Sequence, residues 1–110
     1  MGELHTAWLI HRAAQGAQAT VAEDVIHWGS AGGAEVLGLG AVGTLAVGQA
    51  ADLVIYGLDH PRFFGFHDIA LAPVVAGEPV AVRYSIINGC VVVDKGEIPG
   101  LDLAKMRSEA

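Results

Sequence analysis

Hydrophobic positions near the start of the chain recur with the spacing of a helix. Leu4, Trp8 and His11 lie three or four positions apart, with alanines on the same face. This spacing is typical of an amphipathic helix that packs one face against a neighbour. It predicts a helix over residues 2–14, which ends just before Gly16.

A second helical region is expected from Thr20. Thr20 and Glu23 fit a capping box, in which the hydroxyl and the carboxylate each bond the other residue's backbone N–H. Gly29–Ser30 predicts a break or bend, because glycine is unfavourable inside a helix. A short helical turn over residues 31–37 should then stop at Gly38.

Beyond Gly38 the pattern changes to short apolar runs separated by turn residues. Residues 51–56 are rich in branched and aromatic side chains, which predicts a strand. Residues 80–87 and 90–94 predict two more strands, joined by Asn88-Gly89. Asn-Gly favours a two-residue hairpin, because a type I′ turn needs positive φ at both central positions.

Two short helices complete the predicted order. Asp68 is expected to cap a helix over residues 69–76, although Pro73 inside it is unfavourable. A terminal helix is expected over residues 101–109, with Asp102 as its cap. The order helix, helix, strand, helix, strand, strand, helix predicts an α+β fold.

Composition raises the question of what covers the apolar side chains. Hydrophobic residues make up 53% of the 110 residues, and glycine contributes another 15. A small domain buries a smaller share of its surface than a large one, so it should need fewer apolar residues. Two interpretations remain open: a small domain with an apolar surface, or a piece of a larger protein.

Charge and cysteine content exclude several functional classes. Six Lys and Arg stand against twelve Asp and Glu, a net charge of −6 with no basic cluster, so no nucleic-acid or anionic-membrane partner is expected. The single cysteine, Cys90, excludes an intramolecular disulfide and a Cys-rich zinc site, and we expect it in the core. No segment has the pattern of a signal peptide or a membrane span, so a cytoplasmic location is expected.

Five histidines invite a metal hypothesis, but their spacing does not favour one. His5 and His11 are six positions apart, not the four that place two ligands on one helix face, and no His-X-His occurs. A small metal site built from His60, His67 and Asp68 is the weakest alternative. Surface or capping roles are expected for these residues instead.

No other catalytic pattern is complete. The serines lack a G-x-S-x-G context. Gly38 to Gly43 matches G-x-G-x-x-G, but a helix precedes it and a strand follows, the reverse of a dinucleotide site. We therefore assign no catalytic, cofactor-binding or metal residue, and expect these glycines at helix ends and turns.

Three segments resemble the C-terminal end of metal-dependent amidohydrolase-superfamily enzymes. They are residues 29–39 (GSAGGAEVLGL), 42–54 (VGTLAVGQAADLV) and 87–96 (INGCVVVDKG). They are similar, in order and spacing, to the family patterns A-x-x-L-G, G-x-L-x-x-G-x-x-A-D-L and V-x-x-G-x-x-V-x-x-x-G. Residues 62–74 (RFFGFHDIALAPV) resemble an insert of the branch of cytosine, guanine and 8-oxoguanine deaminases and hydroxyatrazine hydrolases, and residues 3–9 (ELHTAWL) resemble the helix that follows the last barrel strand.

The resemblance implies an incomplete composite fold. Residues 1–40 would be the last helices of a TIM-type barrel, and residues 41–110 the C-terminal strands, hairpin and terminal helix of a small β-sandwich. Family enzymes hold a divalent metal, zinc or iron, through ligands that would lie upstream of this chain. The missing N-terminal barrel is thus the implied partner, and no cofactor is expected in this chain itself.

Two functional hypotheses follow. In the first, the chain is the C-terminal portion of a hydrolase that acts on carbon–nitrogen bonds other than peptide bonds, by deamination of a purine-, pyrimidine- or triazine-like ring, and is inactive alone. In the second, it is a self-associating structural or interaction module without catalysis. Exposed apolar surface makes a homo-oligomer the expectation in either case.

Overall fold

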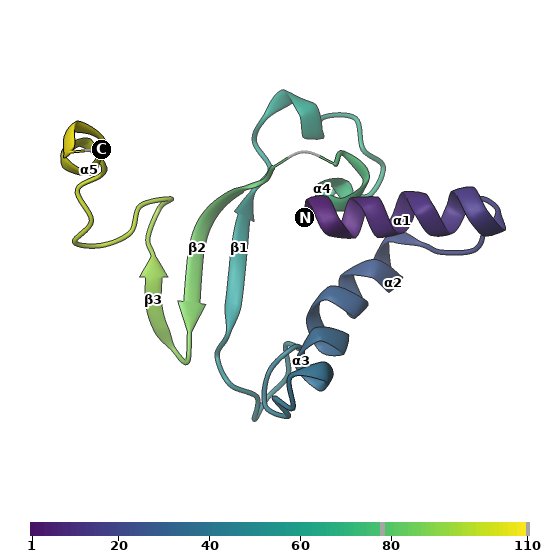
Figure 1. Ribbon diagram of the computed structural model, residues 1–110, viewed down its shortest axis with the longest axis horizontal. Helices are drawn as coiled ribbons and strands as arrows, with labels where there is room; N and C mark the ends of the chain where they lie inside the picture. Colours follow the sequence, from purple (N-terminus) through teal and green to yellow (C-terminus); the bar gives the residue numbers. More distant parts are fainter. Residues whose placement is uncertain (78, 110) are drawn as a thin grey trace.

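The computed structural model describes residues 1–77 and 79–109, which form an α+β arrangement (Figure 1). The elements in chain order are α1 (Gly2–Gln15), α2 (Ala22–His27), a π-helical turn η1 (Trp28–Gly32), α3 (Gly33–Val36), β1 (Leu53–Gly57), a 3₁₀ turn η2 (Pro61–Phe63), α4 (Ala72–Val75), β2 (Ala81–Ile87), β3 (Cys90–Val93) and α5 (Leu103–Glu109). The predicted order of helices and strands is confirmed. Figure 1 shows the first helices on one side of the sheet and α5 on the other.

The sheet has three antiparallel strands in the order β1-β2-β3. Leu53 pairs with Ile86 at one end of the β1–β2 ladder, and Gly57 pairs with Ala81 at the other. Asn88 and Gly89 between β2 and β3 have φ of 49° and 78°, so the hairpin prediction is confirmed. Both outer strands, β1 and β3, keep one edge unpaired within this described sheet.

The helical half is held by a small core between α1, α2 and α4. Val25 of α2 and Val74 of α4 are fully buried there, and Leu4 and Trp8 of α1 pack against them. His5 of α1 adds a hydrogen bond of 2.7 Å between its Nδ1 and the carbonyl oxygen of Val74. These contacts make α1, α2 and α4 one packed unit.

The capping prediction for the second helical region is wrong. Thr20 does not cap α2; it is buried, and the cap lies one residue later, where Val21 N donates to Asp24 Oδ2 at 3.0 Å. The break or bend expected at Gly29–Ser30 takes the form of a π-helical turn, through which the helix continues into α3. Gly29 lets Leu4 of α1 pack closely there, since a Cβ would lie 2.6 Å from a methyl of Leu4.

The helix expected over residues 69–76 is shorter. It begins at Ala72, which places Pro73 in the first turn, where a missing N–H costs nothing. Asp68 instead closes a turn by accepting the N–H of Ala70 at 2.9 Å. The predicted Asp102 cap is confirmed, because its Oδ1 accepts the N–H of Lys105 at 2.9 Å.

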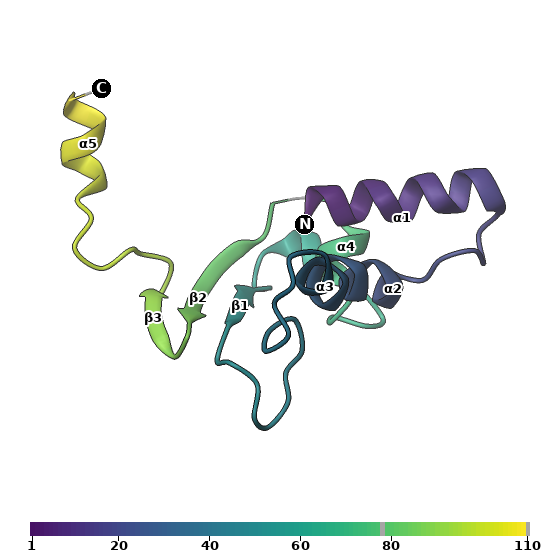
Figure 2. The ribbon, with the colours of Figure 1, turned by 60° about the horizontal axis from the view of Figure 1, so that its bottom comes forward.

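The described chain is open. Its radius of gyration is 16.3 Å, whereas a compact domain of this length is expected near 13 Å. Figure 2 shows α5 standing clear of the rest, with a long loop between α3 and β1 at the lower side. None of the described helices combines the length and apolar character needed to cross a bilayer.

The core of the helical half generates a stability prediction. Val25→Ala should lower the free energy of unfolding by about 1–3 kcal/mol, because it removes buried methyl groups from a core with few large side chains. Val36→Ala makes the same chemical change at a position that is 87% exposed, and should change it by less than about 0.5 kcal/mol. Urea unfolding followed by circular dichroism measures both, and equal effects would contradict the assigned core.

Candidate functional site

The histidines do not converge on a site. His5 contacts Val74, the ring of His11 lies 5.2 Å from the ring of Trp28, and His27 is exposed. Residues 1–77 and 79–109 contain no group of three or more His, Cys, Asp or Glu side chains that could hold a metal. The donor set that a catalytic zinc needs is therefore not assembled within this part of the chain.

The three residues of the weakest metal hypothesis serve local turns. His60 Nδ1 accepts hydrogen bonds from the backbone N of Arg62 at 3.3 Å and from its Nε at 3.0 Å. Asp68 accepts from Ala70, and His67 is exposed. The structure thus gives His60 a capping role at η2, whereas Asp68 and His67 are exposed and Asp68 only closes a turn.

The glycine motif and the cysteine have structural positions. Gly38 follows α3 with φ of 69°, as expected at a helix end. Gly43 also has positive φ. The next element after it is the strand β1, not the helix that a dinucleotide-binding motif requires. Cys90 is exposed at the start of β3, so the expectation that it lies in the core is wrong.

The described residues form a groove between the helical half and β1, which we call the β1 groove. It has a volume of about 750 Å³ and lies where the free edge of β1 faces α1, α2 and η1 (Figure 1). Its lining is mostly apolar, with a few polar groups on the rim. It is formed by Met1, Leu4, Glu23, Ile26, His27, Gly29, Ser30, Gly43, Thr44, Leu45, Asp52, Leu53, Val54 and Tyr56.

The loop between α3 and β1 is fastened at both ends of this groove. Gly43 packs against α3 so closely that a Cβ would lie 2.8 Å from the Cβ of Ala34. At the other end, Asp52 Oδ1 accepts the N–H of Asn88 at 2.5 Å, which ties the start of β1 to the hairpin. These two contacts hold the walls of the groove in place, although the side chain of Leu45, which lines the groove, is 83% exposed.

The sequence analysis assigned no groove residue to a functional site, although one feature of the sequence indicated an uncovered surface here. The run Leu53 to Tyr56 is apolar at every position, which is typical of a strand covered on both faces. Val54 and Ile55 are nevertheless exposed. The strand has the composition of a buried element without the cover that such a strand needs.

The exposed surface area of the chain is larger than that expected for a folded monomer of the same mass. The chain exposes 7849 Å², whereas a folded monomer of 11.4 kDa is expected to expose about 5,800 Å². The excess of about 2,000 Å² is larger than one partner's share, about 800 Å², of a standard protein interface. An excess of this size is large enough for an extensive protein interface.

Comparison with protein families gives one match that spans most of the chain. The amidohydrolase family matches residues 1–92. The match includes α1 to α4, all of β1 and β2, and most of β3.

Three curated relatives carry the names of aminohydrolases. An isoxanthopterin deaminase from an unknown prokaryotic organism is 42% identical over 100% of this chain and 26% of its own length. An 8-oxoguanine deaminase of Pseudomonas aeruginosa is 36% identical over 94% of this chain and 23% of its own. A hydroxydechloroatrazine ethylaminohydrolase of Pseudomonas sp. is 39% identical over 72% of this chain and 17% of its own length. The chain thus spans about a quarter or less of these relatives.

Solved structures extend the comparison to three dimensions. An amidohydrolase from an environmental sample of the Sargasso Sea is 46% identical, with a TM-score of 0.84 over 98% of this chain and 25% of that one. An adenosine deaminase from Xanthomonas campestris with bound zinc is 26% identical, with a TM-score of 0.81 over 97% of this chain and 25% of that one. The open arrangement of this chain therefore recurs inside proteins about four times longer.

The close approach of Gly43 generates a prediction about the groove wall. Gly43→Ala should destabilise the fold by about 1–3 kcal/mol, because it places a side chain at φ of 93° and a Cβ against Ala34. Gly40→Ala is the matched control, since no atom lies within 4 Å of its Cβ position. Thermal unfolding of both variants measures the difference, and two unchanged midpoints would show that the loop is not fastened at Gly43.

Proposed function

The chain belongs to the amidohydrolase family, and we propose that it is the C-terminal quarter of a metal-dependent hydrolase that acts on non-peptide carbon–nitrogen bonds. The observation that carries this proposal is that its open fold matches a quarter of a solved amidohydrolase with a TM-score of 0.84. The deaminase names of its relatives support hydrolytic removal of an amine from a heteroaromatic ring.

The metal chemistry is assigned to polypeptide outside this chain. A structural neighbour binds zinc, but the described residues here contain no cluster that could ligate it. A divalent ion such as zinc supplies the activated water of such hydrolyses. Because residues 1–77 and 79–109 hold no cluster of metal donors, the chain is inactive by itself under this proposal.

The role of the chain is to brace the rest of the enzyme. Helices α1 to α3 supply the last helices of a barrel, and β1 to β3 supply the C-terminal strands of a small sandwich. Leu9 and Ile10 of α1 and Val54 of β1 are exposed apolar side chains on these two halves. Burial of the excess surface against the preceding polypeptide would stabilise both parts, at roughly 25 cal/mol per Å² of apolar area.

A second candidate function is a self-associating module. The unpaired edges of β1 and β3 and the exposed apolar side chains favour it, because such edges can pair with another copy. Size-exclusion chromatography with light scattering separates the two candidates. A single defined oligomer of the chain alone favours the module, whereas a polydisperse aggregate favours a portion that lacks its cover.

Complementation tests the leading proposal. The chain is mixed with the portion of the isoxanthopterin deaminase that precedes its matching segment, produced separately. We expect a one-to-one complex that releases ammonia from isoxanthopterin, while the chain alone releases none. A chain that stays monomeric and protease-resistant and forms no complex would contradict the proposal.

A groove variant sharpens this test. Val54→Glu places a charge in the apolar β1 groove and should weaken the complex by about tenfold or more. Val36→Glu makes the same change at an exposed position outside the groove lining, and should change the affinity by less than about threefold. Equal weakening by both variants would show that the groove is not the contact surface.

A further inference from the structure

The C-terminal arm, defined as residues 98–109, stands away from both halves of the fold (Figure 1 and Figure 2). It consists of an extended connection and α5. Its large apolar side chains, Ile98, Leu101, Leu103 and Met106, are between 41% and 64% exposed. The arm thus presents apolar surface that the described body of the chain does not cover.

Local bonds nevertheless give the arm a defined path. Asp94 and Glu97 form a bridge with backbone N–H···O distances of 2.8 and 2.9 Å just before it. Asp102 caps α5. A helix of seven residues is only marginally stable in water without tertiary contacts. A defined position for α5 therefore requires a surface on which it packs.

The alignment with a solved relative extends into the arm. The Sargasso Sea amidohydrolase aligns with 98% of this chain, which leaves only about two of the 110 residues outside the alignment, fewer than the arm contains. In that structure the matched part is 25% of the chain. The arm therefore has an aligned counterpart in a protein with three times as much further polypeptide available to cover it.

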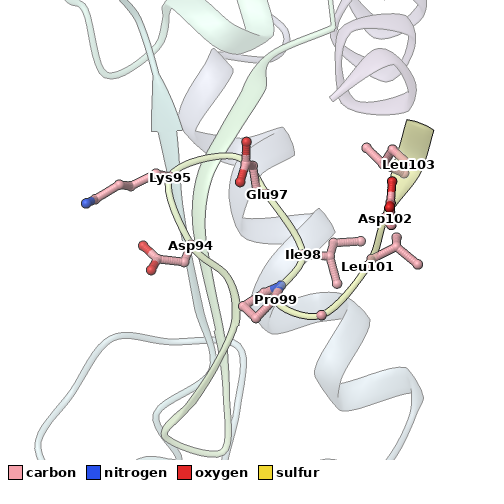
Figure 3. Close-up of a pocket in the computed structure, with 9 residues that line it drawn as sticks. Asp94, Lys95, Glu97, Ile98, Pro99, Leu101, Asp102 and Leu103 are labelled. Carbon is pink, nitrogen blue, oxygen red and sulfur yellow. The ribbon is translucent and has the colours of Figure 1, made fainter. Parts of the chain in front are cut away.

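A hollow at the base of the arm indicates the chemistry of its contact. It has a volume of about 640 Å³ and lies within the turn from Asp94 to Leu103 (Figure 3). Ile98 and Leu101 give it an apolar part, and Glu97 and Asp102 add acidic groups to its lining. In Figure 3 the side chains of Asp94 and Lys95, which also belong to the lining, both point to the side of the turn away from Ile98 and Leu101. Such a hollow is complementary to an apolar side chain flanked by a cation.

We propose that the arm is a docking strap that packs on the polypeptide preceding this chain in the complete protein, at an apolar surface flanked by lysine or arginine. This inference rests on the proposed function, because it needs a longer protein. It goes further, because it assigns α5 a contact surface that is separate from the β1 groove. Removal of the strap's contact should weaken assembly even when the groove is intact.

Hydrogen exchange and affinity together test the strap. The probe is the same preceding portion of the isoxanthopterin deaminase. We expect the amides of α5 to exchange freely in the chain alone and to become protected in the complex. Leu103→Asp with Met106→Asp, which lie three positions apart on one helix face, should weaken the complex by about tenfold or more.

A matched variant controls for charge. Ala104→Asp with Ser108→Asp adds the same two charges on exposed positions of the same helix, and should weaken the complex by less than about threefold. Equal weakening by the two double variants would overturn the strap, because general charge repulsion would then explain both.

Each remaining outcome is decisive. A complex in which α5 still exchanges freely would overturn the strap and leave the proposed function standing. Protection of α5 in the monomeric chain, or only in a dimer at rising concentration, would overturn it in favour of an internal contact or a second copy. If no complex forms, the result contradicts the proposed function, and the strap then has no partner surface on which to pack.

Discussion

The fold depends on one constraint: the chain carries more apolar surface than its own core can cover. The fully buried large side chains are Val25 and Val74, both in the helical half. The sheet has no comparable buried cluster in the described residues, and the β1 groove separates it from the helices. Both halves are therefore locally well formed but leave apolar side chains exposed. Membership of a family whose solved members are about four times longer gives this imbalance a physical explanation.

Local chemistry in the sequence predicts much of the architecture. Asn88-Gly89 and Asp102 act through their own backbone neighbours, so the hairpin and the α5 cap could be predicted without knowledge of the fold. Tertiary packing decides the remaining elements. Thr20 is buried and leaves the capping role to Asp24, which accepts the N–H of Val21, and Gly29 leaves room for Leu4 of α1 to pack against the π turn.

The candidate site could be anticipated only in outline. Apolar excess and the lack of metal-ligand spacing suggested a chain whose chemistry lies elsewhere. The β1 groove could not be predicted, because it joins segments as far apart as Met1 and Tyr56. The exposure of Cys90 was missed for a related reason, since β3 would be covered only if another layer packed on the sheet.

The upstream reading frame in the source DNA tests the central claim most directly. If this chain is the C-terminal quarter of an amidohydrolase, the frame continues upstream of Met1 for about 300 residues or more and encodes a strand followed by His-X-His. The missing metal donors and the cover for the β1 groove would then lie on one polypeptide. A stop codon directly upstream, with a ribosome-binding site, would contradict the account and make the short self-associating module the better explanation.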